Sequence, residues 1–570
     1  MSTAQNHLCP SSRGLKRLFQ PSFALLLIPA LLACTSAPQE TGPGGGPSTA
    51  PAPRLVVFMA VDGLPMRQVT AYRDQLAPDG FARFLDRGAW FAEAHYGHAF
   101  TVTAAGHATM LSGAYPHRSG IIGNDWRDVH TGAAEYCTGD ISAQYIGNKT
   151  NPLDGTSPKN LQVLTVGDML RQAHPGSKVI GISGKDRGAI LPAGKTGTAY
   201  MYMGDTGQFA SSSFYMPAHP AWVEAFNAAR PADRYFQTEW KPLLPEAAYA
   251  RSIPDNQPWF GPNGGALPMR MGKAGVAAPN AEYYRALLRS PFADELTLAF
   301  ARAAIDGEQL GRDDATPDLI SISLSGHDYV NHAYSAESRL SHDHFLQLDR
   351  MLQGFFQHLD NTVGRDRYMV VLTADHGFMQ APELSASEGK SAGRISGTKL
   401  LADVNTALAT QFGAPKLVAF MSASALVLDR KEIAARNLNF DAVADAARTA
   451  LLAQPGLAEA YTRQELAAGA NSPRAGAPFF AAMERSWNAK VSGDVQFVLK
   501  PYWMFGNTTA THGSPYNYDT HVPILTWGPT WVKPGRVEQR VEVVDIAPTL
   551  ARVLHVAAPA TSEGHLLPLP

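Results

Sequence analysis

The sequence of 570 residues is long enough for one large domain with insertions, or for two domains, with a substantial hydrophobic core. Hydrophobic residues make up 45% of the chain and charged residues 17%, which is ordinary for a globular protein. The formal net charge of −2 provides no basic surface for nucleic acid, so we expect no nucleic-acid specificity and only a local anion site.

The N-terminus is typical of an export signal. A basic start is followed by an apolar run from Phe23 to Leu32, which is too short to span a bilayer comfortably. The run ends in Leu31-Leu32-Ala33-Cys34, which resembles the lipobox of bacterial lipoproteins and implies cleavage before Cys34 and lipidation of its thiol. Ordinary secretion with cleavage nearby is the alternative. We therefore expect residues 1–33 to be a signal peptide, and the mature protein to be a periplasmic, membrane-tethered lipoprotein.

Two further features accompany export. Residues 34–53 are rich in Pro, Gly, Ser and Thr, which predicts a flexible tether. The chain has three cysteines, of which Cys9 leaves with the signal peptide and Cys34 would carry lipid. Cys137 then has no partner, so we expect neither a disulfide nor a zinc site made of cysteines.

The pattern of residues after position 53 predicts the α/β class. Four short apolar runs are typical of buried parallel strands: Arg54–Val61, Lys178–Ser183, Asp318–Leu324 and Tyr368–Thr373. Helical patterns separate them, notably Glu295–Leu310 and His342–Val363. Regions near 192–291 and 382–502 read as insertions or caps, because the first lacks clear strand alternation. The expected architecture is an α/β/α sandwich with a mostly parallel central sheet.

Candidate metal ligands follow the predicted strands, where ligands of such sheets bind. Asp328 and His332 are four residues apart, so a helix there would present both on one face. Each feature alone has a simpler explanation, such as a turn, a surface pair or a helix cap, and only their joint occurrence favours metal. Three aspartates and three histidines supply oxygen and imidazole donors, which suit zinc and also other divalent ions. These residues are Asp62, Asp328, His332, Asp375, His376 and His512.

Thr103 is the candidate nucleophile. The residues after it look helical, so its hydroxyl would lie near a helix N-terminus, where the helix dipole and free amides favour an alkoxide or a phosphate. A metal ion beside the hydroxyl would lower its pKa further. A threonine that only caps the helix is the simpler alternative. We interpret His107 and Thr109 as structural.

At this point the sequence resembles the alkaline phosphatase superfamily, in its bacterial branch with a threonine nucleophile and no third, magnesium site. The motifs appear in the family's order and cover the chain from about residue 54 to the C-terminus. The segments that carry the resemblance are Val61-Asp62-Gly63, Thr101-Val102-Thr103-Ala104, Gly123-Asn124-Asp125-Trp126, Gly184-Lys185-Asp186-Arg187, Asp328-Tyr329-Val330-Asn331-His332, Thr373-Ala374-Asp375-His376-Gly377, Thr511-His512-Gly513-Ser514 and Tyr518-Asp519-Thr520-His521.

The resemblance implies an alkaline-phosphatase-like catalytic domain over 54–570, two zinc ions, and hydrolysis of small phosphate monoesters through a phosphothreonine on Thr103. It assigns Asp328, His332 and His512 to one zinc, with His521 as an alternative to His512. It assigns Asp62, Asp375 and His376 to the other zinc, with Thr103 bridging toward it. His327 receives no role. The phosphate oxygens would be bound by Asn124, Lys185 and Arg187.

Three other functions compete with this one. A phosphodiesterase or nucleotide pyrophosphatase on the same scaffold would share the metal ligands but lack the Lys/Arg pair, so Lys185 and Arg187 favour a monoesterase. A surface lipoprotein that only binds metal or ligand would not need an intact nucleophile beside both ligand sets. A sulfatase is disfavoured because no Cys or Ser occupies a sulfatase-type maturation motif.

Overall fold

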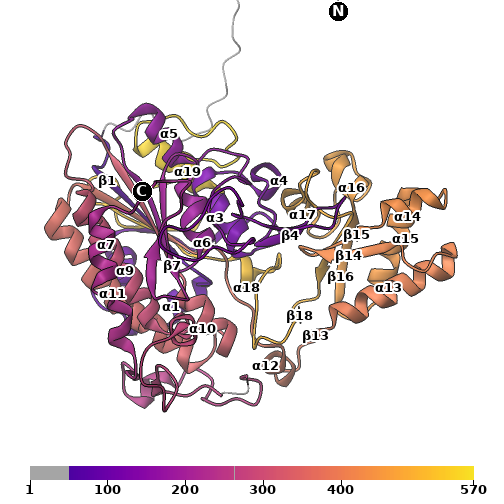
Figure 1. Ribbon diagram of the computed structural model, residues 1–570, viewed down its shortest axis with the longest axis horizontal. Helices are drawn as coiled ribbons and strands as arrows, with labels where there is room; N and C mark the ends of the chain where they lie inside the picture. Colours follow the sequence, from indigo (N-terminus) through magenta and orange to yellow (C-terminus); the bar gives the residue numbers. More distant parts are fainter. Residues whose placement is uncertain (1–49, 262–263) are drawn as a thin grey trace, which may run out of the picture. The chain divides into compact units, whose positions relative to one another are not determined.

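The computed structural model describes residues 50–261 and 264–570, and Figure 1 shows the arrangement of their helices and strands. A nine-stranded sheet lies at the centre of these residues, with strand order β20-β2-β19-β12-β1-β11-β6-β7-β8. The strands from β12 to β7 are parallel, whereas β8 and β19 pair antiparallel with their neighbours. Their bounds are β1 (Leu55–Val61), β2 (Ala89–Phe91), β6 (Val179–Ser183), β7 (Thr198–Met203), β8 (Gln208–Ala210), β11 (Asp318–Leu324), β12 (Tyr368–Thr373), β19 (Ile524–Trp527) and β20 (Gly535–Val537).

All four predicted strands lie in the middle of this sheet. They are buried along their whole length, because helices cover both faces of the sheet and both sides of each strand are apolar. β11 and β12 have the predicted bounds, and β1 and β6 each begin one residue later.

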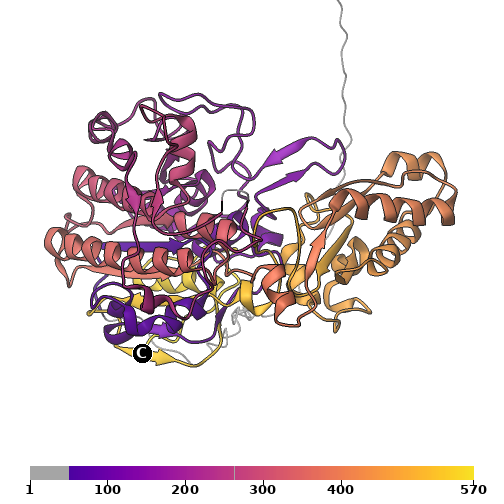
Figure 2. The same cartoon turned by 90° about the horizontal axis from the view of Figure 1, so that it is seen from below.

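Helices pack on both faces of the sheet, which gives the expected three layers (Figures 1 and 2). One layer contains α3 (Thr103–Ser112), α5 (Val166–Ala173), α6 (Asp186–Ala193) and α19 (Ile546–Val553). The other contains α2 (Phe81–Arg87), α7 (Ala221–Ala228), α9 (Pro291–Glu308), α10 (Gly326–Tyr334) and α11 (Arg339–Leu359).

Two predicted helices begin earlier than the sequence pattern indicated. Pro291 occupies the first turn of α9, where its fixed φ angle and missing N–H are tolerated, so this helix starts four residues before Glu295. Ser338 caps α11 by accepting a hydrogen bond from the Ser341 N–H, which places its start before His342.

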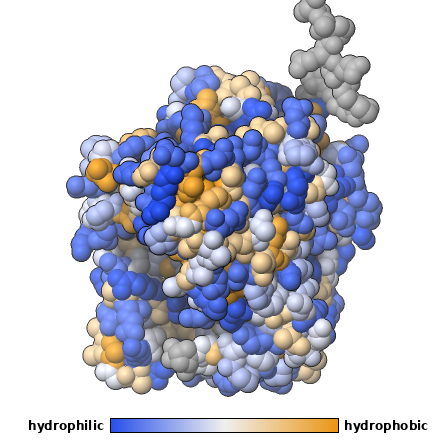
Figure 3. Space-filling view, turned by 90° about the vertical axis from the view of Figure 1, so that its right-hand side faces the viewer, coloured by the Kyte–Doolittle hydropathy of each residue, from blue (hydrophilic) through white to orange (hydrophobic). Residues whose placement is uncertain are grey.

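The two regions expected as insertions differ in structure. Residues near 192–291 contribute β7 and β8 to the central sheet, so the strands there were missed by the sequence pattern. Residues near 382–502 form a separate four-stranded sheet of β14 (Val418–Ser422), β15 (Ala425–Leu428), β16 (Leu457–Thr462) and β17 (Val495–Leu499). The helices α13 (Gly397–Phe412) and α15 (Phe440–Leu452) share a hydrophobic core with this sheet. On the face shown in Figure 3, hydrophobic side chains form small groups between hydrophilic ones.

Several expectations concern the N-terminus. The signal peptide, Cys34 and the tether up to residue 49 lie outside the described residues. Within the described part, Cys137 is buried and free, and burial raises the pKa of its thiol to about 12. No helix of residues 50–261 and 264–570 is both long and apolar enough to cross a membrane.

Candidate functional site

Three neighbouring strands bring three carboxylates to one edge of the central sheet. β1 pairs in parallel with both β11 and β12, so Asp62, Asp328 and Asp375 follow strand ends that lie side by side. Gly63 lets the chain turn here, because its φ is +70° and a Cβ atom would lie 3.2 Å from atoms of Asp328. Its N–H donates to Asp375 Oδ1 at 3.0 Å, which fixes that carboxylate.

The predicted ligands form two compact groups. Asp62, Asp375 and His376 make one, and Asp328, His332 and His512 make the other; in each, one potential ligand atom per residue lies within 4.8 Å of those of the other two. α10 begins at Gly326, so the expected helical spacing places the Asp328 and His332 side chains close together, with His332 Nε2 3.4 Å from Asp328 Oδ1. The rings of His376 and His512 stack with their centroids 3.3 Å apart, so the two groups adjoin.

Backbone carbonyls orient all three histidines of these groups. His332 Nδ1 donates to Ala510 O at 3.0 Å, His376 Nδ1 to Gly377 O at 2.9 Å, and His512 Nδ1 to Thr101 O at 2.9 Å. Because a carbonyl only accepts hydrogen bonds, each Nδ1 carries a proton, so the neutral form of each ring presents its lone pair at Nε2. Metal-binding histidines are commonly held in this way.

Buried polar atoms without partners test whether the groups fit a metal. Asp62 Oδ1, Asp328 Oδ1, Asp375 Oδ2 and His376 Nε2 are buried with no hydrogen bond to any described residue. Buried polar atoms are normally satisfied, so four such atoms at one place need an explanation. Oxygen and imidazole donors in these positions fit bound divalent cations.

Lys185 connects the two groups. Its Nζ lies 2.6 Å from Asp62 Oδ2 and 2.6 Å from Asp328 Oδ2, and its side chain is almost fully buried. Burial alone would lower the pKa of Lys185, but the carboxylates of Asp328 and Asp62 raise it above its ordinary value. Lys185 is therefore charged at neutral pH and partly neutralises the cluster of aspartates.

Thr103 is the first residue of α3, and the preceding Val102 occupies the cap position. The alternative of a simple threonine cap therefore does not describe this residue. Thr103 is 1% exposed, and its carbonyl contacts His107 Nδ1 at 2.8 Å. α3 packs directly on the Asp375 backbone, because a Cβ on Gly106 would lie 2.2 Å from Asp375 O.

Asn124 lies beside the N-terminus of α3, and Arg187 lies in the first turn of α6. Asn124 Oδ1 accepts from the Ala104 N–H at 2.9 Å, which ties its amide to the N-terminus of α3. Arg187 Nη1 donates to the Tyr136 hydroxyl at 3.0 Å, while its Nε is buried without a partner among the described residues. Burial opposes the charge of Arg187, but Tyr136 and Asp186 raise its pKa above the ordinary value.

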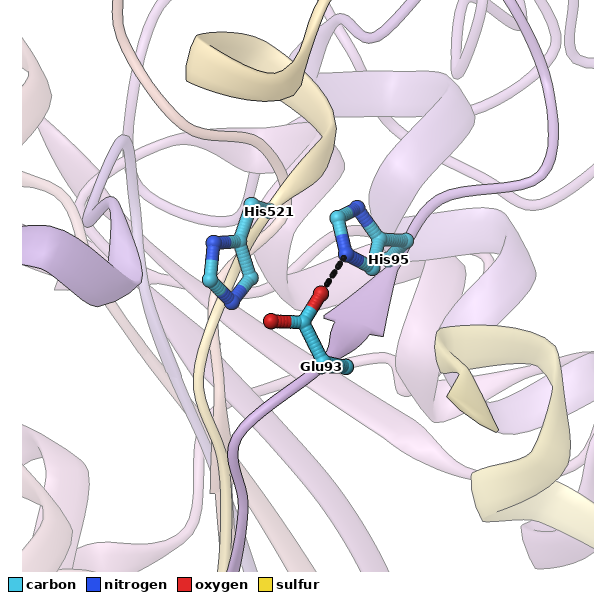
Figure 4. Close-up of side chains that lie close together, drawn as sticks. All are labelled: Glu93, His95 and His521. Carbon is cyan, nitrogen blue, oxygen red and sulfur yellow. Dashed lines mark hydrogen bonds and ion pairs between the residues drawn. The ribbon is translucent and has the colours of Figure 1, made fainter. Parts of the chain in front are cut away.

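His521, the alternative last ligand, belongs to a different group with Glu93 and His95 (Figure 4). The ligand atoms of this third group also lie within 4.8 Å of one another. However, His95 Nε2 already contacts Glu93 Oε2 at 3.1 Å, and His521 Nε2 contacts Ala92 O at 2.7 Å. The structure thus brings His512, rather than His521, beside Asp328 and His332.

Several residues outside the predicted ligand and phosphate-binding sets support the site. His107 contacts the carbonyl of Thr103 at 2.8 Å, Ser323 Oγ at 2.8 Å and Asp375 Oδ2 at 3.4 Å, so it links the helix to the ligand carboxylate. His327, which had no assignment, contacts His344 and Gln68 in a buried network behind Asp328. The position of His107 one helical turn after Thr103 was a usable signal.

Comparisons with known proteins cover most of the chain. The family model described as type I phosphodiesterase / nucleotide pyrophosphatase matches residues 56–520. The chain is 34% identical over 520 residues to a Myroides odoratus protein named calcium-transporting ATPase. The matched region covers 90% of this chain and 93% of that protein. It is also 34% identical over 526 residues to alkaline phosphatase PafA of Elizabethkingia meningoseptica, over 90% of this chain and 94% of PafA.

The comparison with solved structures also finds alkaline phosphatase PafA. The crystal structure of wild-type PafA has a TM-score of 0.83 at 33% identity and covers 91% of this chain and 99% of that chain. A second PafA structure, with a TM-score of 0.82, carries substitutions at a threonine, an asparagine, a lysine and an arginine. These four residue types occur in the same order as Thr103, Asn124, Lys185 and Arg187, with equal spacing within the first pair and within the second.

Proposed function

Because the chain belongs to the type I phosphodiesterase / nucleotide pyrophosphatase family of the alkaline phosphatase superfamily, we propose that it is an alkaline phosphatase acting through a covalent phosphothreonine on Thr103. It is a phosphoric monoester hydrolase, in keeping with the alkaline phosphatases that it matches over most of its length. The observation that carries the mechanism is the pair of metal-ligand-type groups at one edge of the sheet, with the buried Lys185 between them and Thr103 at the start of the helix that packs on Asp375.

The chain's own residues perform the binding and the transfer. Asn124, Lys185 and Arg187 donate hydrogen bonds to the non-bridging oxygens, which carry the charge of a loose transition state. Thr103 Oγ1 then forms a bond to phosphorus as the bond to the alcohol oxygen breaks, and the alcohol leaves with a proton. Water attacks the phosphothreonine, which releases inorganic phosphate and restores the hydroxyl.

We infer two zinc ions per chain as the cofactors. Asp328, His332 and His512 would hold one, and Asp62, Asp375 and His376 the other, with Thr103 bridging toward the second. When bound, zinc would supply the Lewis acidity that lowers the pKa of a threonine hydroxyl and stabilises charge on the leaving oxygen. The three Nε2 lone pairs and the unpartnered carboxylate oxygens support this assignment.

A phosphodiesterase or nucleotide pyrophosphatase on the same scaffold is the second candidate, since the matching family model carries that description. Arg187 and Lys185 argue for monoesters, because an esterified oxygen would present carbon rather than charge to one of them. The test is turnover of para-nitrophenyl phosphate and of its methyl diester by one sample whose metal content is measured. Preference for the diester would refute the monoesterase.

The proposal includes export and domain organisation. A lipoprotein signal over 1–33, lipidation of Cys34 and a tether over 34–53 would leave the catalytic domain, 54–570, in the periplasmic space. The domain would carry insertions near 192–291 and 382–502. The sequence around Cys34 supports this part of the proposal, and mass spectrometry of the mature N-terminus tests it.

A further inference from the structure

Two cavities border the candidate functional site. The larger, of about 390 Å³, is lined by Asn124 and Val102, and the smaller, of about 160 Å³, by His512 and Gly513. Both are also lined by the same three aromatic side chains, Phe100, Phe497 and Phe505. Because Val102 directly precedes Thr103, the larger cavity begins beside the attacking residue.

Two regions of the chain build the larger cavity. Trp126 comes from β4 (Asp125–Arg127), whereas Met421 comes from the second inserted region and Phe505 from β18 (Trp503–Phe505), the strand that follows it. The Arg127 N–H donates to Ser422 Oγ at 2.9 Å, which joins the two walls. The rings of Phe497 and Phe505 lie 6.0 Å apart at 67°, an edge-to-face arrangement.

Aromatic side chains form one wall of this cavity, and polar residues such as Ser422 and Ser424 lie beside them. Its charged residues, Asp125 and Arg127, are both exposed, whereas Trp126 and Phe497 are buried. An uncharged ring gains from burial against such walls and from ring-to-ring packing.

We propose that this cavity binds the alcohol part of the substrate and selects monoesters whose leaving group carries an uncharged, planar aromatic ring. The inference rests on the proposed function, because a leaving group enters the cavity only if Thr103 attacks a phosphoryl group held by Asn124. A volume of about 390 Å³ lies in the range of small-ligand pockets and suits one or two rings.

The experiment compares three esters of primary alcohols with similar leaving-group chemistry: ethyl phosphate, 2-cyclohexylethyl phosphate and 2-phenylethyl phosphate. We expect kcat/KM for the phenyl ester to exceed that for the ethyl ester by about 10- to 100-fold, with the cyclohexyl ester between them. Binding of 2-phenylethylphosphonate and ethylphosphonate, which are not hydrolysed, gives the same comparison without turnover.

Substitutions of Phe505 test whether this cavity causes the preference for the phenyl ester. Phe505→Ala should lower the preference for the phenyl ester by about 3- to 10-fold, while kcat/KM for ethyl phosphate and inhibition by inorganic phosphate stay unchanged. Phe505→Leu keeps an apolar wall and should lose mainly the preference for phenyl over cyclohexyl. Phe420→Ala is the matched control, because it removes a ring from β14 that does not line the cavity.

The outcomes separate this inference from the proposed function. Equal kcat/KM values for the three esters in the wild-type enzyme would overturn the inference and leave the monoesterase intact. An equal loss of preference in Phe505→Ala and Phe420→Ala would also overturn it. Hydrolysis of diesters but of none of the monoesters would instead refute the proposed function. The comparison of esters on wild-type enzyme stands even if a Phe505 variant does not fold.

Discussion

Replacement of Arg187 by alanine tests the assignment of this enzyme to monoesters. Tyr136 engages only Nη1, so the edge of the guanidinium with the unpartnered Nε is free for a phosphoryl group. Such an edge makes two charge-assisted hydrogen bonds, each worth about 1.5–3 kcal/mol, or about 3–6 kcal/mol together. Arg187→Ala should therefore lower monoester kcat/KM by about 10²- to 10⁴-fold. Lys185 is less suitable for this test, because it also contacts Asp62 and Asp328.

The assay uses para-nitrophenyl phosphate and methyl para-nitrophenyl phosphate, which share one leaving group, so effects at the leaving oxygen cancel. The diester lacks one of the charged oxygens, and its kcat/KM should fall by less than about tenfold. Arg187→Lys keeps the charge but not the fork, and should recover part of the loss. Metal content must match that of the wild type in both variants. Equal losses on the two substrates would show that Arg187 supports the site generally, and the reasoning would be wrong.

Four further predictions concern the nucleophile, the metal, the anchor and stability. Thr103→Ala should lose most turnover while keeping its metal, and Thr103→Ser should keep substantial activity; labelled phosphate on another residue after acid quenching would exclude Thr103. Purified protein should contain about two zinc ions per chain and lose activity to a chelator until zinc is restored, whereas full activity without transition metal would contradict the cofactor assignment. Mass spectrometry should find lipid on Cys34, and Cys34→Ala should release or misprocess the protein; an unmodified Cys34 in mature protein would refute the anchor. His98 is buried without a hydrogen bond to the described residues, and burial lowers its pKa to about 3, so the unfolded chain alone takes up a proton below about pH 6.5. Stability is thus lost as the pH falls, by about 2 kcal/mol between pH 6.5 and 5, and urea unfolding of His98→Phe should show a smaller loss over this range.

The centre of the fold could be predicted because its strands are apolar on both faces. β12 is apolar up to Thr373, and β11 is apolar apart from Asp318, Ser321 and Ser323; both strands have the predicted bounds. β7 and β8 were missed because they lie in a region rich in alanine and glycine, and β8 is only three residues long. Their place in the sheet comes from pairing with β6 and with each other, which a local pattern does not encode.

The candidate site also contains residues that could be predicted from the sequence and residues that could not. Candidate metal ligands could be named because Asp62, Asp328 and Asp375 follow strands, whereas Asn124, Lys185 and Arg187 were named only from the family resemblance. The residues that hold them could not, since their contacts join distant parts of the chain. Tyr136 reaches Arg187 across 51 positions, and the wall formed by Ser422 meets Arg127 across 295. Such contacts are a property of the assembled fold rather than of sequence spacing.

The loop that carries the nucleophile and the loop that carries His512 are tied together. Thr101 O accepts from His512 Nδ1, and Thr101 Oγ1 donates to Ser514 O at 3.0 Å. We therefore expect the two segments to move together, so that the distance between Thr103 and His512 varies less than the position of either residue. Anyone who grafts this chemistry onto another scaffold must transplant both loops with their mutual hydrogen bonds, since the side chains alone would drift independently.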